Sequence, residues 1–246
     1  MHLVGPRTGG CHAWLVPARI RRPQVWVVVP AHNEATRVGE VVTGLRQHFS
    51  QIVVIDDGSR DGTGAIARRA GARVVRHVIN LGQGAALQTG FDFVRSHAAA
   101  MAVTFDADGQ HDPQAAAAMV DQAHDSGVDV VLGSRFLGHA QWVPPVRRAV
   151  LRAAIAYTRL STRMAVTDTH NGLRVLGRRF IDVADLRDPG MGHASEILDI
   201  IASHRLTWSE YPTEIHYDDY SRAKGQSSIN ALNIVFDRLF HAGVGR

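Results

Sequence analysis

The sequence predicts an α/β protein with a mostly parallel central sheet flanked by helices. Over residues 24–135, short apolar runs alternate with longer segments of helical periodicity, which is the pattern of consecutive β–α–β units. These runs are almost continuously apolar, as expected for strands buried on both faces of a parallel sheet. Each of the first four runs leads into a polar stretch, and the ligands of such sheets bind at the carboxyl ends of the strands.

The first half of the chain carries five predicted strands, at 24–29, 51–56, 72–77, 101–106 and 128–133. Helical periodicity predicts a first helix within 33–49, where four apolar residues share one face: Val38, Val41, Val42 and Leu45. The segments 61–71 and 84–98 predict the second and third helices. Asn33 and Asp61 are of the residue types that cap helix N-termini, and we expect them to do so.

The second half is less regular. A basic amphipathic helix is expected at 144–164, followed by a loop, "DTHNGLRVLG", at 168–177. A further helix is predicted at 193–206 and a strand at 207–217. The chain then passes through a polar stretch to an apolar-patterned segment at 229–240.

The composition predicts one folded domain at 23–246, after a poorly ordered lead-in at 1–22. With 246 residues, of which 45% are hydrophobic, the chain has ample material for a core. No apolar run approaches the roughly 20 residues that cross a bilayer, and the lead-in lacks the pattern of a signal peptide. The single cysteine, Cys11, cannot form an internal disulfide, which fits a cytoplasmic protein.

The formal net charge of +4 favours anionic ligands. Nucleotide phosphates, acidic lipid headgroups and nucleic acid all qualify. Nucleic acid is not expected as a partner, because the arginines are not interleaved with aromatic residues and no nucleic-acid-binding motif is present. Nothing in the sequence indicates an oligomeric state.

Four polar stretches follow the first four strands: "PAHNEA", "DDGSRDGT", "NLGQGAA" and "DADGQHDP". Each alone resembles an ordinary turn, but their repetition at one edge of a sheet predicts a site. In the third, Gly82 and Gly84 suggest a dinucleotide fingerprint, yet position 87 is leucine and no phosphate-binding loop follows. We therefore expect neither a dehydrogenase nor an NTPase, and the glycines are expected to let the backbone approach a ligand or a neighbouring loop.

Asp106 and Asp108 are two residues apart, so an extended backbone directs both carboxylates to the same side. They would repel each other unless protonated, hydrated or bridged by a hard cation. Mg²⁺ or Mn²⁺ suits such ligands and completes its shell with phosphate and water. An acid/base dyad is the alternative. His111 is either a further ligand or part of the start of the next helix.

The order of six motifs indicates a family resemblance. The motifs are "VVVPAHNEA", "VVIDDGSRDGT", "NLGQGAALQTGF", "VTFDADGQHDP", "VVLGSRF" and "DTHNGLRVL". Over residues 24–180 they resemble the family 2 nucleotide-sugar glycosyltransferases, in particular the polyprenyl-phosphate (dolichol-phosphate) mannose or glucose synthase-like branch. The resemblance implies the GT-A fold, with a Rossmann-like nucleotide-binding half at about 23–135 and an acceptor-side half at about 136–246.

The resemblance also implies a donor site. In the family, the loop after the first strand and the acidic end of the second hold the nucleoside. Here the nucleotide-sugar contacts would be Pro30, Ala31, Asn33, Glu34, Asp56, Asp57, Gly84, Asp106 and Ala107. The metal motif falls on Asp106 and Asp108, with Gln110 following it. Mg²⁺ or Mn²⁺ there would neutralise charge on the departing diphosphate.

On the acceptor side, Arg135 matches the family's GSR arginine, and it is expected to act in catalysis together with Asp106 and Asp168. Candidates for binding phosphate are Arg135, Arg147, Arg148, Arg222 and Lys224, although Arg147 and Arg148 equally fit a solvated helix face. Asp168 would orient a phosphate acceptor, or act as general base toward a hydroxyl. Glu196 is a weaker second candidate for the base.

Two residues depart from the branch, Asn171 in place of serine and Leu173 in place of phenylalanine, which leaves the acceptor open. The expected activity is inverting, metal-dependent transfer of a hexose from a GDP- or UDP-sugar to polyprenyl phosphate. It would take place at the cytoplasmic face of a membrane, with peripheral contact through 144–164 or 229–240. The alternatives are a soluble sugar or phosphorylated metabolite as acceptor, and a nucleotide-binding protein without turnover.

Overall fold

The computed structural model of the chain describes residues 24–137, 164–169 and 171–215. Several sequence predictions lie outside these residues: the lead-in with Cys11, the amphipathic segment before Met164, the segment 229–240, and the phosphate-binding candidates Arg147, Arg148, Arg222 and Lys224.

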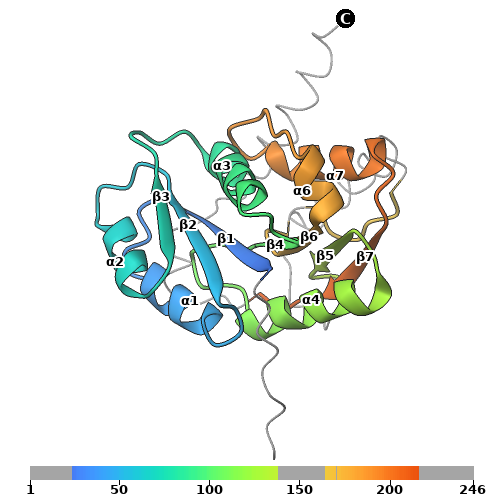
Figure 1. Cartoon of the computed structure of the whole chain (residues 1–246), viewed down its shortest axis with the longest axis horizontal. Coiled ribbons are helices and arrows are strands. Elements are labelled where there is room, and N and C mark those ends of the chain that lie inside the picture. The colour runs from blue at the N-terminus through green and yellow to red at the C-terminus, as the bar shows by residue number, and fades with distance from the viewer. Residues whose placement is uncertain (1–23, 138–163, 170, 216–246) are drawn as a thin grey trace, which may run out of the picture.

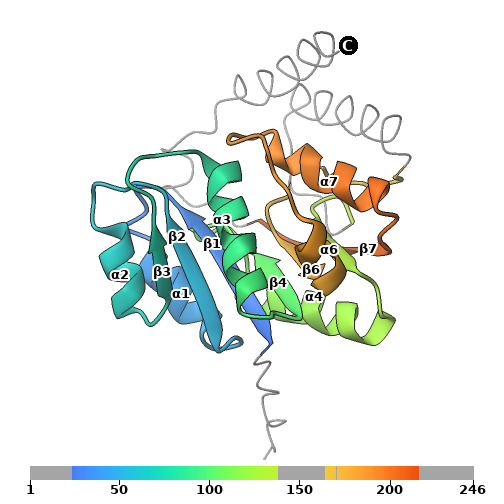
Figure 2. The same ribbon diagram turned by 45° about the horizontal axis from the view of Figure 1, so that its top comes forward.

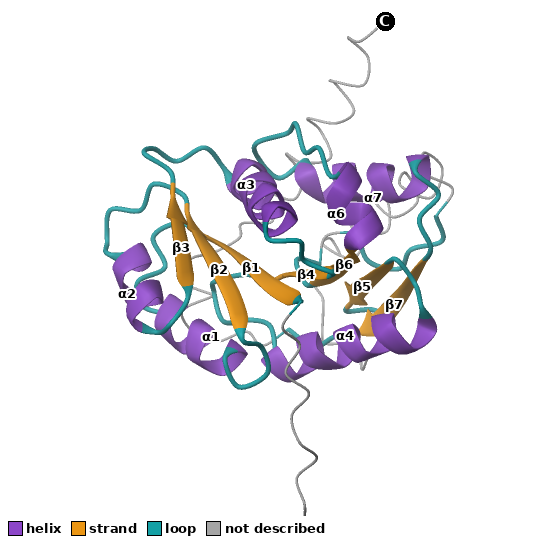
Figure 3. Cartoon of the chain, in the orientation of Figure 1, coloured by secondary structure: helices purple, strands orange, loops and turns teal. Residues whose placement is uncertain are grey.

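The described residues form a seven-stranded sheet in the order β3-β2-β1-β4-β6-β5-β7 (Figures 1 and 3). Strands β1 to β4 are parallel to one another, β6 is antiparallel to both its neighbours, and β5 and β7 are parallel. The mostly parallel α/β sheet predicted from the sequence is confirmed. The strand bounds are β1 Val25–Ala31, β2 Gln51–Asp56, β3 Arg73–Arg76, β4 Met101–Thr104, β5 Val130–Ser134, β6 Arg174–Gly177 and β7 Trp208–Pro212.

Helices cover both faces of this sheet. Figures 1 and 2 show α1, α2 and α4 on one face and α3, α6 and α7 on the other. Side chains alternate along each strand, so in β1 Val27 packs into the core beneath α1 and α4, whereas Val28 packs into the core beneath α3. This explains the continuously apolar strands. The helix bounds are α1 Val38–Leu45, α2 Thr63–Arg69, α3 Gln83–Ser96, α4 Pro113–Ser126, α6 Arg178–Val183 and α7 His193–Ser203.

The predicted loop at 168–177 is wrong in its second half, because Arg174–Gly177 is strand β6. This strand pairs Val175 with Val103 of β4 on one side and with Val131 of β5 on the other. It therefore separates two strands that would otherwise be adjacent. The four residues of β6 include only two apolar side chains, Val175 and Leu176, which are too few for periodicity to distinguish a strand from a loop.

The predicted cap at Asn33 is also wrong, since α1 begins five residues later at Val38. Asn33 instead adopts a left-handed conformation with φ of 55° in the loop after β1. At α2, Gly62 occupies the N-cap position, but the Asp61 carboxylate accepts a hydrogen bond from Thr63 N (3.0 Å) and so satisfies a free N–H of the first turn. In the described part of the chain, no helix has the length and apolarity needed to cross a bilayer.

Candidate active site

The loops after β1 and β2 are hydrogen-bonded into one unit at the carboxyl edge of the sheet. Asn33 N donates to Ser59 Oγ (3.0 Å), and Arg60 N donates to Asn33 Oδ1 (2.9 Å). Glu34 N donates to Thr63 Oγ1 (2.8 Å). The left-handed backbone at Asn33, which asparagine tolerates better than most residues, turns the chain so that these bonds form.

Asp56 ends β2 beside the end of β1, where it pairs in register with Ala31, the residue after the buried Pro30. Its side chain is buried and accepts a hydrogen bond from Ser59 N (3.0 Å), with Arg76 Nε 3.5 Å from its second oxygen. A Cβ at Gly64 would lie 2.5 Å from that oxygen, so only glycine fits there. The strand end expected to hold the nucleoside is thus rigidly built.

Asp57 has a different environment from Asp56. One of its oxygens accepts hydrogen bonds from His77 Nδ1 (2.7 Å) and Leu81 N (2.8 Å), and the other accepts from Gly82 N (2.8 Å). Its side chain is only 4% exposed. The carboxylate therefore fixes the loop between β3 and α3, and in this arrangement its oxygens serve that loop.

The glycines of "NLGQGAA" allow the start of α3 to pack against the loop between α6 and α7. Gly84 N donates to Pro189 O (2.8 Å), and side chains at 82 and 84 would clash with the carbonyl oxygens of Pro189 and Asp188. Of the two roles that the sequence left open for these glycines, the structure shows close approach to a neighbouring loop. Glu196, the second candidate base, anchors the same loop by accepting from Arg187 N (3.0 Å) and Asp188 N (3.1 Å).

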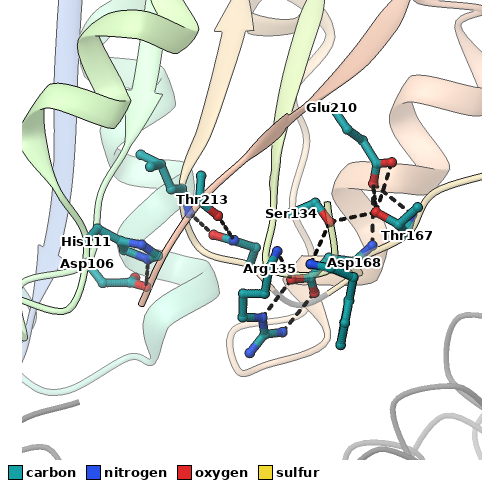
Figure 4. Close-up of polar contacts among 11 residues, drawn as sticks. Asp106, His111, Ser134, Arg135, Thr167, Asp168, Glu210 and Thr213 are labelled. Atoms are coloured by element: carbon teal, nitrogen blue, oxygen red, sulfur yellow. Dashed lines mark hydrogen bonds and ion pairs between the residues drawn. The ribbon is translucent and has the colours of Figure 1, made fainter. Parts of the chain in front are cut away.

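Asp106 lies just beyond β4, where several elements converge. It accepts hydrogen bonds from Gln83 (3.1 Å) and from His111 Nε2 (3.2 Å; Figure 4). Burial by itself would raise the pKa of Asp106. The hydrogen bond from His111 and the charges of His111 and Arg174 outweigh it and bring the pKa below its ordinary value. Asp106 is therefore ionised at neutral pH.

Asp108 has the opposite electrostatic environment. Burial and the nearby carboxylates of Asp106 and Glu34 raise its pKa to about 6, although Gln110 N donates to it (3.0 Å). Ala107, between the two aspartates, is buried in the core, whereas both aspartates are only partly buried. A divalent cation bound to both carboxylates would relieve the repulsion between them, so these residues fit the implied metal.

No group of three His, Cys, Asp or Glu residues arranged to hold a metal occurs within 24–137, 164–169 and 171–215. A site with two protein carboxylates that completes its shell with substrate phosphates and water needs no such cage. His111 contacts Asp106 through Nε2, and its buried Nδ1 has no hydrogen-bond partner among the described residues. It lies directly before Asp112, whose side chain caps α4 by accepting from Gln114 N.

Arg135 and Asp168, the two residues expected from the sequence on the acceptor side, form a bidentate ion pair (Figure 4). Arg135 Nε and Nη2 lie 2.6 and 2.8 Å from the two oxygens of Asp168, and Arg135 N donates to the same carboxylate (3.1 Å). The Asp168 side chain is 1% exposed and that of Arg135 is 19% exposed. This geometry combines charge with a fixed orientation.

Glu210 of β7 holds the segment that carries Asp168. It accepts from Thr167 N (2.7 Å) and from the Thr167 hydroxyl, which also contacts Ser134 Oγ (2.6 Å; Figure 4). The residues that depart from the family pattern are part of the same support. Asn171 is buried and bonds Thr213 Oγ1 (2.8 Å) and Leu173 N (3.0 Å), and Leu173 is fully buried in the core. These two departures thus alter packing beneath the site.

Arg174, the last residue of "DTHNGLR", was missed as a candidate by sequence reasoning. It is 3% exposed, and burial lowers its pKa to about 10 while the charges of Asp106 and Asp168 oppose that change. The buried guanidinium of Arg174 thus interacts electrostatically with both Asp106 and Asp168. His193, at the start of α7, was also missed; burial and the charge of Arg174 lower its pKa. Neither residue had a periodic signal, although Arg174 lies within the quoted motif "DTHNGLRVL".

Residues 26–182 match the family model described as glycosyl transferase family 2. The chain is 29% identical over 244 residues to UDP-N-acetylglucosamine–dolichyl-phosphate N-acetylglucosaminyltransferase of Methanococcus voltae, covering 90% of this chain and 97% of that protein. It is 33% identical over 183 residues to polyprenol monophosphomannose synthase of Mycolicibacterium smegmatis, covering 69% and 68%.

Its fold is similar to that of glucosyl-3-phosphoglycerate synthase from Mycobacterium tuberculosis, crystallised with Mn²⁺, UDP and glucosyl-3-phosphoglycerate. The TM-score is 0.64 at 19% identity, over 87% of this chain and 79% of that one. This likeness is one of fold, and the fold is GT-A. The order of motifs, the sheet topology and the family match agree, and the chain belongs to glycosyl transferase family 2.

Proposed function

We propose that this glycosyltransferase moves a hexose from a nucleotide sugar of the GDP-mannose or UDP-glucose type to polyprenyl phosphate, with inversion at the anomeric carbon. The family match supports glycosyl transfer. The names of two relatives, a dolichyl-phosphate and a polyprenol monophosphate enzyme, support a lipid phosphate as acceptor. The observation that carries the proposal is the ion pair between Arg135 and Asp168.

Asp168 is poorly suited to remove a proton from an acceptor hydroxyl. Its carboxylate receives three N–H groups of Arg135 and is almost completely buried. Taking up a proton there would break the ion pair and leave the partly buried guanidinium without its counter-charge. A phosphate monoester is already an anionic nucleophile and requires no base. Asp168 instead holds Arg135 in a fixed orientation toward an anionic acceptor.

On the donor side, the hydrogen-bonded loops after β1 and β2 would bind the nucleoside through five residues: Pro30, Ala31, Asn33, Glu34 and Asp56. Asp108 with Asp106 and Gln110 would hold Mg²⁺ or Mn²⁺. When bound, such a cation supplies neutralising charge for the diphosphate that departs from the anomeric carbon. Asp106 stays ionised because of its hydrogen bonds and its positive neighbours, so it keeps its affinity for cationic or hydroxyl groups of the donor.

The acceptor is a membrane lipid, so we place the enzyme at the cytoplasmic face of a membrane, with peripheral contact. The solved structure of similar fold that contains glucosyl-3-phosphoglycerate gives a specific reason to test a soluble acceptor as well. That reading keeps the same donor chemistry and replaces the lipid phosphate with a small phosphorylated metabolite.

The test is a transfer assay with Mn²⁺, labelled GDP-mannose, UDP-glucose or UDP-N-acetylglucosamine, and three acceptors: polyprenyl phosphate, the unphosphorylated polyprenol, and 3-phosphoglycerate. We expect labelled lipid from polyprenyl phosphate and none from polyprenol, because the candidate base Asp168 is held by Arg135. Label only in the aqueous phosphoglycerate product would replace the lipid reading with the soluble one. Equal use of polyprenol would contradict the role given to Asp168.

A further inference from the structure

Gln83 is the first residue of α3, and its side chain reaches the donor-side aspartate Asp106. Its amide Nε2 lies 3.1 Å from Asp106 Oδ1, while His111 Nε2 lies 3.2 Å from Asp106 Oδ2. The two oxygens of Asp106 thus each meet one N–H donor, and the donors come from different elements. A carboxylate held in this way has a restricted orientation and keeps a further lone pair on each oxygen.

His111 acts as a donor here because of its surroundings. An ionised Asp106 only accepts hydrogen bonds, so the proton of the contact lies on His111 Nε2. The other nitrogen, Nδ1, is buried without a hydrogen-bond partner in the described part of the chain. The Phe105 ring packs edge-on against the imidazole, with ring centroids 5.7 Å apart, and fixes its plane.

Hydrogen bonds hold the backbone on both sides of Gln83. The residue before it, Gly82, donates its N–H to Asp57 (2.8 Å), and the residue after it, Gly84, donates to Pro189 O (2.8 Å). The absence of side chains at both glycines lets the loop at 188–190 lie against them. The first turn of α3 is therefore held between two loops, which fixes the position of the Gln83 backbone.

Asp108 contrasts with Asp106, because the hydrogen bond described for its side chain comes from the local backbone at Gln110 (3.0 Å). We propose that Gln83 is a positioning residue that, together with His111, orients the Asp106 carboxylate for the metal-bound nucleotide of the donor. The inference rests on the proposed function for the nature of that ligand. Residues that orient a metal-binding group in this way typically contribute about 10–100-fold in metal affinity.

The test is calorimetric titration of the full chain with Mn²⁺ and UDP or GDP. Gln83→Met keeps the length of the side chain and removes the donor, and we expect at least about tenfold weaker binding of Mn²⁺ with the nucleotide. Gln83→Asn, which is polar but one methylene too short to span the contact, should show the same loss if the methionine variant folds poorly. The matched control is Gln122→Met, which removes an amide donor to Ser209 Oγ (2.8 Å) away from Asp106 and should bind within about twofold of wild type.

A double variant with His111→Leu separates a role at Asp106 from a general loss of stability. Because both donors act on one carboxylate, its loss of affinity should be smaller than the product of the two single losses. Binding within twofold of wild type in both Gln83 variants, or no Mn²⁺ binding by the wild type, would overturn the inference. Wild-type binding of Mn²⁺ and nucleotide without sugar transfer would refute the proposed function and leave the positioning role intact.

Discussion

The ion pair between Arg135 and Asp168 gives the sharpest test of the proposed acceptor side. Asp168→Asn keeps the shape of the side chain and removes its charge. The change loses one of two short contacts, at 2.6 and 2.8 Å, and leaves Arg135 opposite a neutral amide. Breaking one side of a buried pair costs about 3–5 kcal/mol. Arg135 is 19% exposed, so water partly solvates it, and we take the lower end, about 3 kcal/mol.

This loss should be visible in thermal unfolding followed by circular dichroism. For a chain of this size, about 3 kcal/mol corresponds to a fall of roughly 6–12 °C in Tm. The matched control is Asp182→Asn, which breaks an exposed helix pair with Arg178 (2.7 Å, with side chains 44% and 47% exposed) and should shift Tm by no more than about 2 °C. The double variant Arg135→Gln with Asp168→Asn should lose less than Asp168→Asn alone, because it leaves no guanidinium without its counter-charge.

The same variant also tests the proposed chemistry. If Asp168 only orients Arg135, Asp168→Asn should weaken use of polyprenyl phosphate and leave the pH profile of the remaining activity unchanged. Loss of the acidic limb from that profile would show that Asp168 accepts a proton, because a general base is inactivated when it is protonated at low pH. A Tm within 2 °C of wild type would refute the buried ion pair itself.

Three other predictions concern the donor side. Asp108→Ala should abolish both Mn²⁺ binding and sugar transfer, measured by titration and by the lipid assay, and undiminished transfer would exclude the metal site. Because the pKa of Asp108 is raised to about 6, Mn²⁺ must compete with a proton for this carboxylate below that pH. The affinity for Mn²⁺ should therefore be steady above about pH 7 and fall about tenfold per pH unit well below pH 6. An affinity that does not change with pH, in titrations at several pH values, would contradict this environment of Asp108. Gly84→Ala places a methyl group against Asp188 O and should destabilise the fold by about 1–3 kcal/mol in urea unfolding, whereas Ala85→Gly next to it should cost no more than about 1 kcal/mol.

Most of the fold was predictable because its signals are local. The apolar runs of β1 to β5, the apolar face of α1 and the helix α3 follow from spacing within a few residues, and the structure confirms them with shifted ends. The strand β6 was not predictable, since four residues in a loop-like context acquire strand geometry only by pairing with β4 and β5. Asn33 was misassigned as a cap because its partners, Ser59 and Arg60, lie far along the chain.

The parallel strands β1 to β4, the polar strand ends and the paired aspartates Asp106 and Asp108 follow from the sequence, because each is encoded in contiguous residues. The individual roles of the residues in the site depend on tertiary contacts. Asp57 holds a loop, Glu196 anchors another, and Gln83 reaches Asp106 from 23 positions away. The different pKa values of Asp106 and Asp108 arise from neighbours brought together by folding, among them Arg174 and Glu34. Burial and long-range hydrogen bonds set these properties, and neither leaves a periodic pattern in the chain.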